Sequence, residues 1–385
     1  MRKLSDTIAR LASLRNAADM SAVPRGRLES LPNFGSNPGA LQAHIYVPPT
    51  LCDGAALVVV MHGCTQTAAG YDVGAGWSEM ADRYGFALLF PEQQRRNNPN
   101  LCFNWFSPED SRRGSGEALS IRKMIDAVAG AHPIDPARIF VTGLSAGGAM
   151  ASVMLATYPE VFAGGAIIAG LPYGCASTIP QAFDRMRGHS VPREAELAAL
   201  VRGASDHPGP WPTLSIWHGS ADPTVNPNNA DAIIAQWRAL HGVGVDPART
   251  EAVDGYPRRV WCNATGHEVI EEYSITGMGH GTPLDTAGEN GCGKSGAYML
   301  EASICSTRHI CRFWGLVGSD KHAVHVRPAE AAPTRQSLAL TFGSNAVNET
   351  PGAGVPTARP LIDVPAIGGV GKVIEDALRA AGLMR

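Results

Sequence analysis

Apolar runs and helix-like segments alternate along residues 40–280 of the chain. Continuous apolar stretches, typical of strands that are covered on both faces of a sheet, lie at residues 56–61, 86–90 and 164–169. Further strand-like stretches are residues 43–47, 139–142, 213–217, 258–261 and 271–276. Helices are expected between them, at residues 77–84, 117–131 and 229–240. The alternation predicts an α/β fold with a mostly parallel central sheet and helices on both faces.

Residues 170–212 interrupt this alternation, since they hold several prolines, no strand-like stretch and one helix-like stretch at 194–202. Consecutive strands of such a sheet are usually joined by a single helix. The extra length predicts a cap insertion over the site. We therefore expect a catalytic domain at residues 30–316 with a cap at residues 170–212.

The two ends of the chain have a different pattern. Residues 1–29 are expected to form an N-terminal amphipathic helix, whose apolar face has Leu4, Ile8, Leu11 and Leu14. Residues 317–370 are rich in Ala, Pro, Val and Gly, which predicts a linker or a surface-draped segment. Residues 371–385 are expected to form a second amphipathic helix. Packing against the domain is the default interpretation of both helices, and contact with a lipid or polymer surface is the alternative.

Composition narrows the class of protein. The chain has 385 residues, of which 44% are hydrophobic and 17% charged, as expected for a folded globular enzyme. Its net charge of −3 provides no basic footprint for nucleic acid. Its apolar runs are too short to span a bilayer. Basic residues near the N-terminus are followed by no continuous apolar stretch, so we expect no secretory signal and a cytoplasmic location.

Eight cysteines are present, and none forms a C-x-x-C pair. Cys292, Cys305, His309 and Cys311 lie close in sequence, but their spacing fits no common metal site. Buried thiols or one local disulfide are the preferred interpretation, and no metal or cofactor is expected. A disulfide between Cys64 and Cys102 is conceivable, although a reducing cytoplasm would disfavour it.

Residues 138–150 organise the chain around Gly143-Leu144-Ser145-Ala146-Gly147. A strand-like stretch precedes this G-x-S-x-G pentapeptide and a helix-like stretch follows it, which is the context of the nucleophile elbow of α/β-hydrolases. The serine of an elbow has strained backbone dihedrals, and glycines on either side let strand and helix approach closely. The sequence therefore predicts Ser145 as a nucleophile.

Two backbone amides are expected to form an oxyanion hole. The strand at 56–61 ends in His62-Gly63-Cys64-Thr65-Gln66, where the fold places one N–H donor, and the residue after the nucleophile supplies the other. This assigns the pair to the N–H groups of Cys64 and Ala146. His62, Gln66 and Trp105 are candidate substrate-binding residues, with plain packing as the alternative for Trp105.

Asp222 and His280 are the candidate partners of the serine. Each follows a strand-like stretch, so both belong to the sheet edge that carries Ser145. The order Ser…Asp…His is that of α/β-hydrolases, in which the histidine takes the serine proton and the aspartate holds the imidazole. The weaker alternatives are His62 and His218 as the base and Asp206 and Asp285 as the acid.

The set of motifs resembles the polyhydroxybutyrate depolymerase family of esterases. The segments that carry the resemblance are residues 62–66, 102–105, 143–147, 218–222 and 277–283, and the similarity extends over about residues 34–316. The resemblance implies an α/β-hydrolase domain that hydrolyses polyhydroxyalkanoate or its oligomers through an acyl-enzyme, without a cofactor. The wider family also implies an alternative, a feruloyl or acetylxylan esterase acting on small plant-derived esters.

Secreted polymer degraders of this kind usually carry a signal peptide and a polymer-binding module, and neither is recognised in the sequence. We therefore expect intracellular polymer or soluble oligomers as substrate, with a polymer-granule surface as a candidate partner. A granule-associated structural protein with a decayed site is the hypothesis from another functional class. The complete set Ser145, Asp222 and His280 argues against it.

Overall fold

The structure, a computed structural model, describes residues 26–287 and 291–317. Ten strands form one sheet in the order β1-β2-β4-β3-β5-β6-β7-β10-β9-β8. The six central strands are parallel: β4 (Ala87–Glu92), β3 (Ala55–Met61), β5 (Ile134–Leu144), β6 (Gly164–Ile168), β7 (Thr213–Gly219) and β10 (Glu268–Ile275). The antiparallel edge strands are β1 (Glu29–Ser30), β2 (Gln42–Tyr46), β9 (Tyr256–Cys262) and β8 (Arg249–Val253). The mostly parallel sheet predicted from the apolar runs is confirmed.

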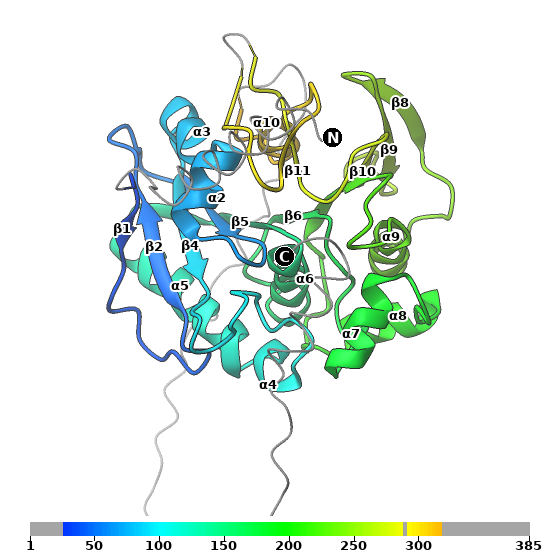
Figure 1. Ribbon diagram of the computed structural model, residues 1–385, viewed down its shortest axis with the longest axis horizontal. Coiled ribbons are helices and arrows are strands. Elements are labelled where there is room, and N and C mark those ends of the chain that lie inside the picture. Colours follow the sequence, from blue (N-terminus) through cyan, green and yellow to red (C-terminus); the bar gives the residue numbers. More distant parts are fainter. Residues whose placement is uncertain (1–25, 288–290, 318–385) are drawn as a thin grey trace, which may run out of the picture.

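Helices cover both faces of the sheet (Figure 1). One face carries α2 (Ala68–Ala75), α3 (Trp77–Tyr84) and α10 (Ser306–Phe313). The other carries α5 (Gly116–Ala131), α6 (Ala146–Thr157), α8 (Glu194–Arg202) and α9 (Asn228–His241). The short helices α4 (Pro108–Ser111) and α7 (Ile179–Met186) and the small sheet of β11 (Thr282–Leu284) and β12 (Met299–Glu301) complete the described elements.

The core is divided between these two faces because side chains alternate along each strand. On β3, Leu57, Val59 and Met61 belong to the cluster under α5 and α6, whereas Val58 and Val60 belong to the cluster under α2 and α3. All seven residues of β3 are buried. A strand buried on both faces has no polar positions, which is why its sequence is a continuous apolar run.

Residues 170–212 have the expected secondary structure, but the cap predicted over the site stays a prediction. As expected, residues 194–202 form a helix and the insertion contains no strand. However, α8 packs against α9 on the side of the sheet, with Leu197 and Val201 buried, instead of lying over the carboxyl ends of the strands. Met186, the last residue of α7, lines the pocket at that edge.

The predicted terminal helices lie largely outside the described residues. Residues 1–25 and 318–385 are not described, so the N-terminal helix, the linker and the helix at 371–385 stay predictions. The expected boundary at residue 29 is wrong, because Glu29 already pairs with Ile45 of β2. Strand β8 was not expected from the sequence. Its residues are exposed or half-buried, so it has no apolar pattern.

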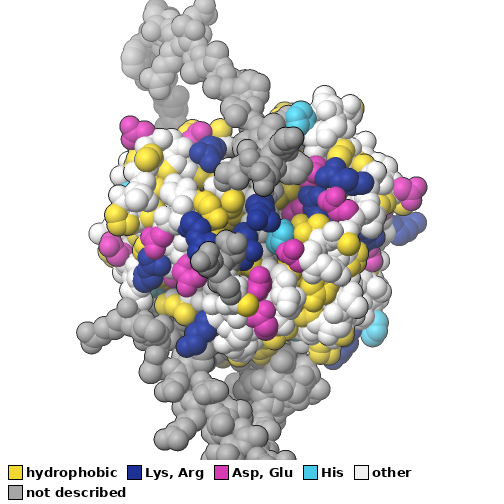
Figure 2. All heavy atoms as spheres, turned by 90° about the horizontal axis from the view of Figure 1, so that it is seen from above, with side chains coloured by type: hydrophobic (Ala, Val, Ile, Leu, Met, Phe, Trp, Pro, Cys, Tyr) yellow, Lys and Arg dark blue, Asp and Glu magenta, His cyan; other side chains and the backbone are white. Residues whose placement is uncertain are grey.

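The part of the chain that the structure describes contains no helix that is both long and apolar enough to cross a membrane. On the face shown in Figure 2, outside the grey residues, basic side chains alternate with acidic ones. The part of this face that is visible in Figure 2 therefore shows no extended surface of basic side chains alone.

Candidate active site

Ser145, Asp222 and His280 lie at the same edge of the sheet. Ser145 follows β5, Asp222 follows β7 and His280 follows β10, and all three strands are parallel. Strands β7 and β10 are neighbours, which brings their loops into contact, and Ala221 N donates to Met278 O. The carboxyl edge of a parallel sheet is where open α/β folds bind ligands.

The turn at Ser145 has the geometry expected of a nucleophile elbow. Ser145 has φ 57° and ψ −117°, and α6 starts at the next residue. A Cβ atom on Gly147 would lie 2.4 Å from Met61 O and 2.5 Å from His62 O. Only glycine fits where α6 crosses the end of β3, so the role predicted for Gly147 is confirmed. The close crossing holds the serine in a backbone conformation that L-residues otherwise avoid.

Asp222 and His280 form a buried pair. His280 Nδ1 donates to Asp222 Oδ2 at 2.7 Å, and the side chains are 7% and 0% exposed. Because a carboxylate only accepts hydrogen bonds, Nδ1 carries the hydrogen and Nε2 of the neutral ring is left as an acceptor. The second oxygen, Oδ1, accepts the N–H groups of Thr224 at 2.8 Å and Val225 at 2.9 Å. The ring is therefore held in the tautomer that can accept a proton from a serine.

Asp222 is kept ionised by its neighbours. Burial alone would raise the pKa of this carboxyl, but hydrogen bonds from His218 and His280 and the N–H of Val225 bring its pKa well below its usual range. His218, considered from the sequence as an alternative base, is also buried here. Its Nε2 lies 2.8 Å from Val225 O and 3.4 Å from Asp222 Oδ2. It contacts the acid of the pair and does not line the pocket that contains Ser145.

The two amides predicted as oxyanion donors are both free to bind a ligand. Neither the N–H of Cys64 nor that of Ala146 has a hydrogen-bond partner among the described residues. Ala146 is the first residue of α6, where the helix leaves amide groups unpaired. Cys64 lines the pocket beside Ser145. The arrangement provides two donors where an acyl group on Ser145 would develop negative charge.

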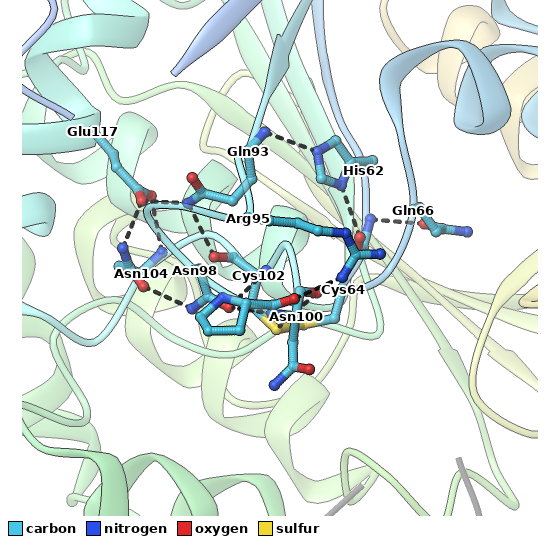
Figure 3. The surroundings of a disulfide bond; sticks show 12 residues. His62, Cys64, Gln66, Gln93, Arg95, Asn98, Asn100, Cys102, Asn104 and Glu117 are labelled. Atoms are coloured by element: carbon cyan, nitrogen blue, oxygen red, sulfur yellow. Dashed lines mark hydrogen bonds between the residues drawn. A yellow bond between two sulfur atoms is a disulfide. The ribbon is translucent and has the colours of Figure 1, made fainter. Parts of the chain in front are cut away.

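A disulfide and a buried polar network hold the loop that carries Cys64 (Figure 3). Cys64 is bonded to Cys102, so the disulfide left open by the sequence is present. Beside it, Thr65 N donates to Asn100 O at 2.7 Å, and Gly63 N donates to Gln66 Oε1 at 2.8 Å. These contacts fix the Cys64 amide relative to the long loop after β4.

Glu117 is the centre of that network. Its carboxylate accepts from Gln93 Nε2 at 2.6 Å, from Asn104 Nδ2 at 2.8 Å and from Asn104 N at 2.9 Å. Burial and the nearby Asp110 carboxylate raise the pKa of Glu117 to about 8, and these hydrogen bonds oppose the rise. The network turns residues 93–105 inward and thereby places Cys102 against Cys64.

We predict that a Cys64→Ser/Cys102→Ser double variant loses about tenfold in kcat with little change in KM. Removing an oxyanion donor entirely costs roughly 10²–10³ in kcat. Here the amide remains and the Thr65–Asn100 hydrogen bond still holds it, so the loss is partial. A Cys52→Ser/Cys262→Ser variant makes the same chemical change at two unpaired cysteines away from the pocket. Steady-state kinetics giving equal kcat for both double variants would contradict the positioning role.

Ser145 and His280 line one small pocket of about 50 Å³. No hydrogen bond joins the two side chains in the structure, and such contacts often tighten only when substrate binds. The full lining is Gly63, Cys64, Thr65, Gln66, Leu144, Ser145, Met186, Thr224, His280 and Tyr298. Three of these, Thr65, Ser145 and Tyr298, have a positive φ, and backbone strain of this kind concentrates at functional sites.

Two of the three expected substrate-binding residues do not line this pocket. The expectation for Trp105 as a pocket wall is wrong, because it is 7% exposed and packs in the core against Phe106. His62 is buried, with Nδ1 on Gly63 O and Nε2 accepting from Gln93 N, so its contacts are with the loop. Gln66 does line the pocket. The sequence missed Met186, Thr224 and Tyr298, which no motif marks.

A larger hollow of about 480 Å³ lies at the opposite, amino ends of the strands, among residues such as Arg138, Thr213 and Glu268. Most of its carboxylates are already paired, since Arg258 binds Glu251, Glu268 and Glu271 across strands β8, β9 and β10. The hollow contains none of the three candidate residues. We therefore assign the site to the smaller pocket.

The remaining cysteines include a second disulfide, Cys292–Cys305, in agreement with the local disulfide considered from the sequence. His309 of that stretch binds Asp254 instead, and Cys311 is a buried free thiol. Within the described residues, no group of three or more His, Cys, Asp or Glu side chains is arranged to hold a metal ion.

Comparison with known proteins identifies the family. Residues 41–254 match the family described as Esterase PHB depolymerase. Poly(3-hydroxyalkanoate) depolymerase C of Paucimonas lemoignei is 48% identical over 293 residues, which are 76% of this chain and 70% of that protein. The chain belongs to this esterase family. The resemblance carried by its motifs is thereby confirmed, and with it the assignment to the carboxylic ester hydrolases.

More distant relatives are named for other esters. Feruloyl esterase B of Talaromyces stipitatus is 31% identical over 269 residues, covering 68% of this chain and 74% of that protein. Among solved structures, an acetyl xylan esterase from Aspergillus awamori matches with a TM-score of 0.61 and 28% identity, over 66% of this chain and 93% of its own. This likeness and the observed sheet confirm the α/β-hydrolase fold.

Proposed function

We propose that the protein is a serine esterase in which Ser145 is the nucleophile, His280 the general base and acid, and Asp222 the residue that holds the imidazole. The observation that carries the proposal is the buried Asp222–His280 pair, whose histidine lines the same pocket as a serine held at a positive φ. Ser145 Oγ adds to the ester carbonyl carbon and His280 takes the hydroxyl proton. The C–O bond then breaks, and the departing alcohol takes that proton from His280.

Water then hydrolyses the acyl-enzyme with the help of the same residues. His280 removes a proton from water, the hydroxyl adds to the acyl carbon, and Ser145 leaves with the proton from His280 while the carboxylic acid is released. During both additions the carbonyl oxygen becomes an oxyanion, for which the free amides of Cys64 and Ala146 are the proposed donors. No step requires a metal ion or an organic cofactor.

The proposed substrate is poly(3-hydroxyalkanoate) or its short oligomers. The relative named a poly(3-hydroxyalkanoate) depolymerase is 48% identical to this chain over the 293 aligned residues, against 31% over 269 residues for the feruloyl esterase. The small volume of the pocket, about 50 Å³, supports a compact acyl unit better than an aromatic one. A feruloyl or acetylxylan esterase is the second candidate, supported by the match to the acetyl xylan esterase structure.

Product release decides between these substrates. Purified protein would be given poly(3-hydroxybutyrate), the soluble 3-hydroxybutyrate trimer, methyl ferulate and acetylated xylan under identical conditions. We expect release of 3-hydroxybutyrate from the trimer or the polymer, with the aromatic ester cleaved far more slowly. Cleavage of ferulate or xylan acetate alone would move the substrate to the second candidate while leaving the mechanism intact.

The location of the protein and its binding to polymer granules stay predictions. The two disulfides are the features that bear on location, because disulfides persist mainly in oxidising compartments. They favour such a compartment over the reducing cytoplasm expected from the N-terminal sequence.

A further inference from the structure

Tyr298 occupies a turn position that normally requires glycine. Gly296 and Met299 exchange two backbone hydrogen bonds, of 3.0 and 3.1 Å, around a two-residue turn made of Ala297 and Tyr298. Tyr298 has φ 61°, whereas Ala297 is not among the residues with positive φ. This combination of signs is that of a type II turn, whose third residue is usually Gly or Asn. A bulky aromatic residue there is a conformational outlier.

The surroundings impose this conformation on Tyr298. The turn lies inside the segment closed by the Cys292–Cys305 disulfide. Strand β12, which begins at Met299, pairs with β11, and Tyr298 O accepts the N–H of Thr282 at 2.8 Å. Several independent contacts therefore hold this strained residue against Thr282, two positions after His280. Strain retained under such constraints commonly serves a function.

The Tyr298 side chain faces Ser145 and His280. It lines the pocket with Ser145 and His280, and its ring meets the His280 ring edge-on, with centroids 6.1 Å apart and planes at 79°. The ring is half-buried, and its hydroxyl has no hydrogen-bond partner among the described residues. Burial raises the pKa of Tyr298, so the phenol is neutral at ordinary pH and can donate a hydrogen bond.

We propose that Tyr298 is a substrate-binding and specificity-determining residue whose hydroxyl donates a hydrogen bond to the ester group next to the one being cleaved. The inference rests on the proposed polyester or oligoester substrate, in which successive ester groups are separated by only two carbon atoms. A neighbouring carbonyl therefore lies close to the scissile bond in every such substrate. Simple esters lack this acceptor, so the contact would select oligoesters over them.

The test compares two substrates in the Tyr298→Phe variant. The 3-hydroxybutyrate trimer has a second ester, and p-nitrophenyl butyrate has only one. We expect kcat/KM for the trimer to fall about three- to tenfold, the loss typical of one hydrogen bond to a neutral acceptor, and kcat/KM for p-nitrophenyl butyrate to fall by a clearly smaller factor. Tyr84→Phe is the matched control, since it removes a hydroxyl from another half-buried tyrosine outside the pocket.

A second variant tests the ring. Tyr298→Gly suits the positive φ of the turn, so we expect it to fold with a melting temperature no lower than that of the wild type. Its kcat/KM for the trimer should nevertheless fall further than that of Tyr298→Phe. A residue kept only for packing would give the opposite result, a lower melting temperature with unchanged trimer cleavage.

The outcomes separate the subsite from the function on which it rests. Wild-type protein that hydrolyses p-nitrophenyl butyrate but not the trimer would refute the oligoester function itself. Wild-type trimer cleavage combined with an unaffected Tyr298→Phe variant would refute the subsite alone. Equal losses on both substrates would also overturn it, because they would place Tyr298 in support of His280 and not in contact with a second ester.

Discussion

Ser145→Ala is expected to lower kcat about a million-fold for every ester that the wild type cleaves, as removal of the nucleophile does in serine hydrolases of this design. The substitution removes only the hydroxyl group. The α6 amides, the Asp222–His280 pair and the free N–H of Cys64 all remain. Residual turnover would come from these groups acting on water. The measurement is release of 3-hydroxybutyrate from the trimer by protein free of host esterase.

Folding of the variant can be checked independently, because Ser145 is strained. At φ 57° alanine is no better than serine, so Ser145→Ala should melt close to the wild type. Ser145→Gly should be inactive and about 1 kcal/mol more stable, since glycine tolerates positive φ. Ser36→Ala, at an exposed serine, controls for the substitution itself. Near-normal activity of Ser145→Ala would refute the nucleophile assignment.

The positions of Ser145, Asp222 and His280 could be predicted from sequence for a simple physical reason. Each directly follows a strand of a parallel sheet, and the carboxyl ends of such strands meet at one edge. The elbow could be recognised because a Cβ atom at position 147 would lie 2.4 Å from a backbone oxygen of β3, which restricts this position to glycine. Such features depend on local geometry, so short sequence motifs are enough to identify them.

Features that depend on how a loop packs in the folded protein could not be predicted from local sequence patterns. Trp105 was expected in the pocket, yet the Glu117 network turns its loop inward and buries the ring. Tyr298 reaches His280 only because a disulfide closes residues 292–305 and the turn is held in an unusual conformation. Strand β8 pairs with β9 and contributes Glu251 to Arg258, and its residues are exposed or half-buried, so periodicity could not reveal it.

Asp222→Asn is expected to lower kcat about ten-thousand-fold while leaving the fold intact, because it reverses the histidine tautomer. Asp222 Oδ1 accepts two backbone N–H groups, from Thr224 and Val225. The single oxygen of asparagine will be held there, since its NH₂ group cannot face two donors. That NH₂ group must then point at His280 Nδ1. Because an NH₂ group only donates, Nδ1 has to accept its hydrogen bond and can no longer carry a hydrogen. The hydrogen moves to Nε2, and the ring can no longer take a proton from Ser145.

An alternative acid considered from the sequence can be tested in the same way, and Asp222→Asn also changes how the melting temperature depends on pH. Asp206→Asn, at an exposed carboxylate, should leave kcat unchanged, and a large loss there would overturn the assignment of Asp222.

Because the pKa of Asp222 is lower in the folded protein than in the unfolded chain, its charge stabilises the fold above the unfolded pKa. That stabilisation is lost as pH falls toward the folded value, and asparagine has none to lose. Melting temperatures measured from pH 7 down to pH 3 should therefore fall less steeply for Asp222→Asn than for the wild type. An identical acid dependence would mean that the Asp222 carboxylate is not stabilised in its ionised form by His218 and His280.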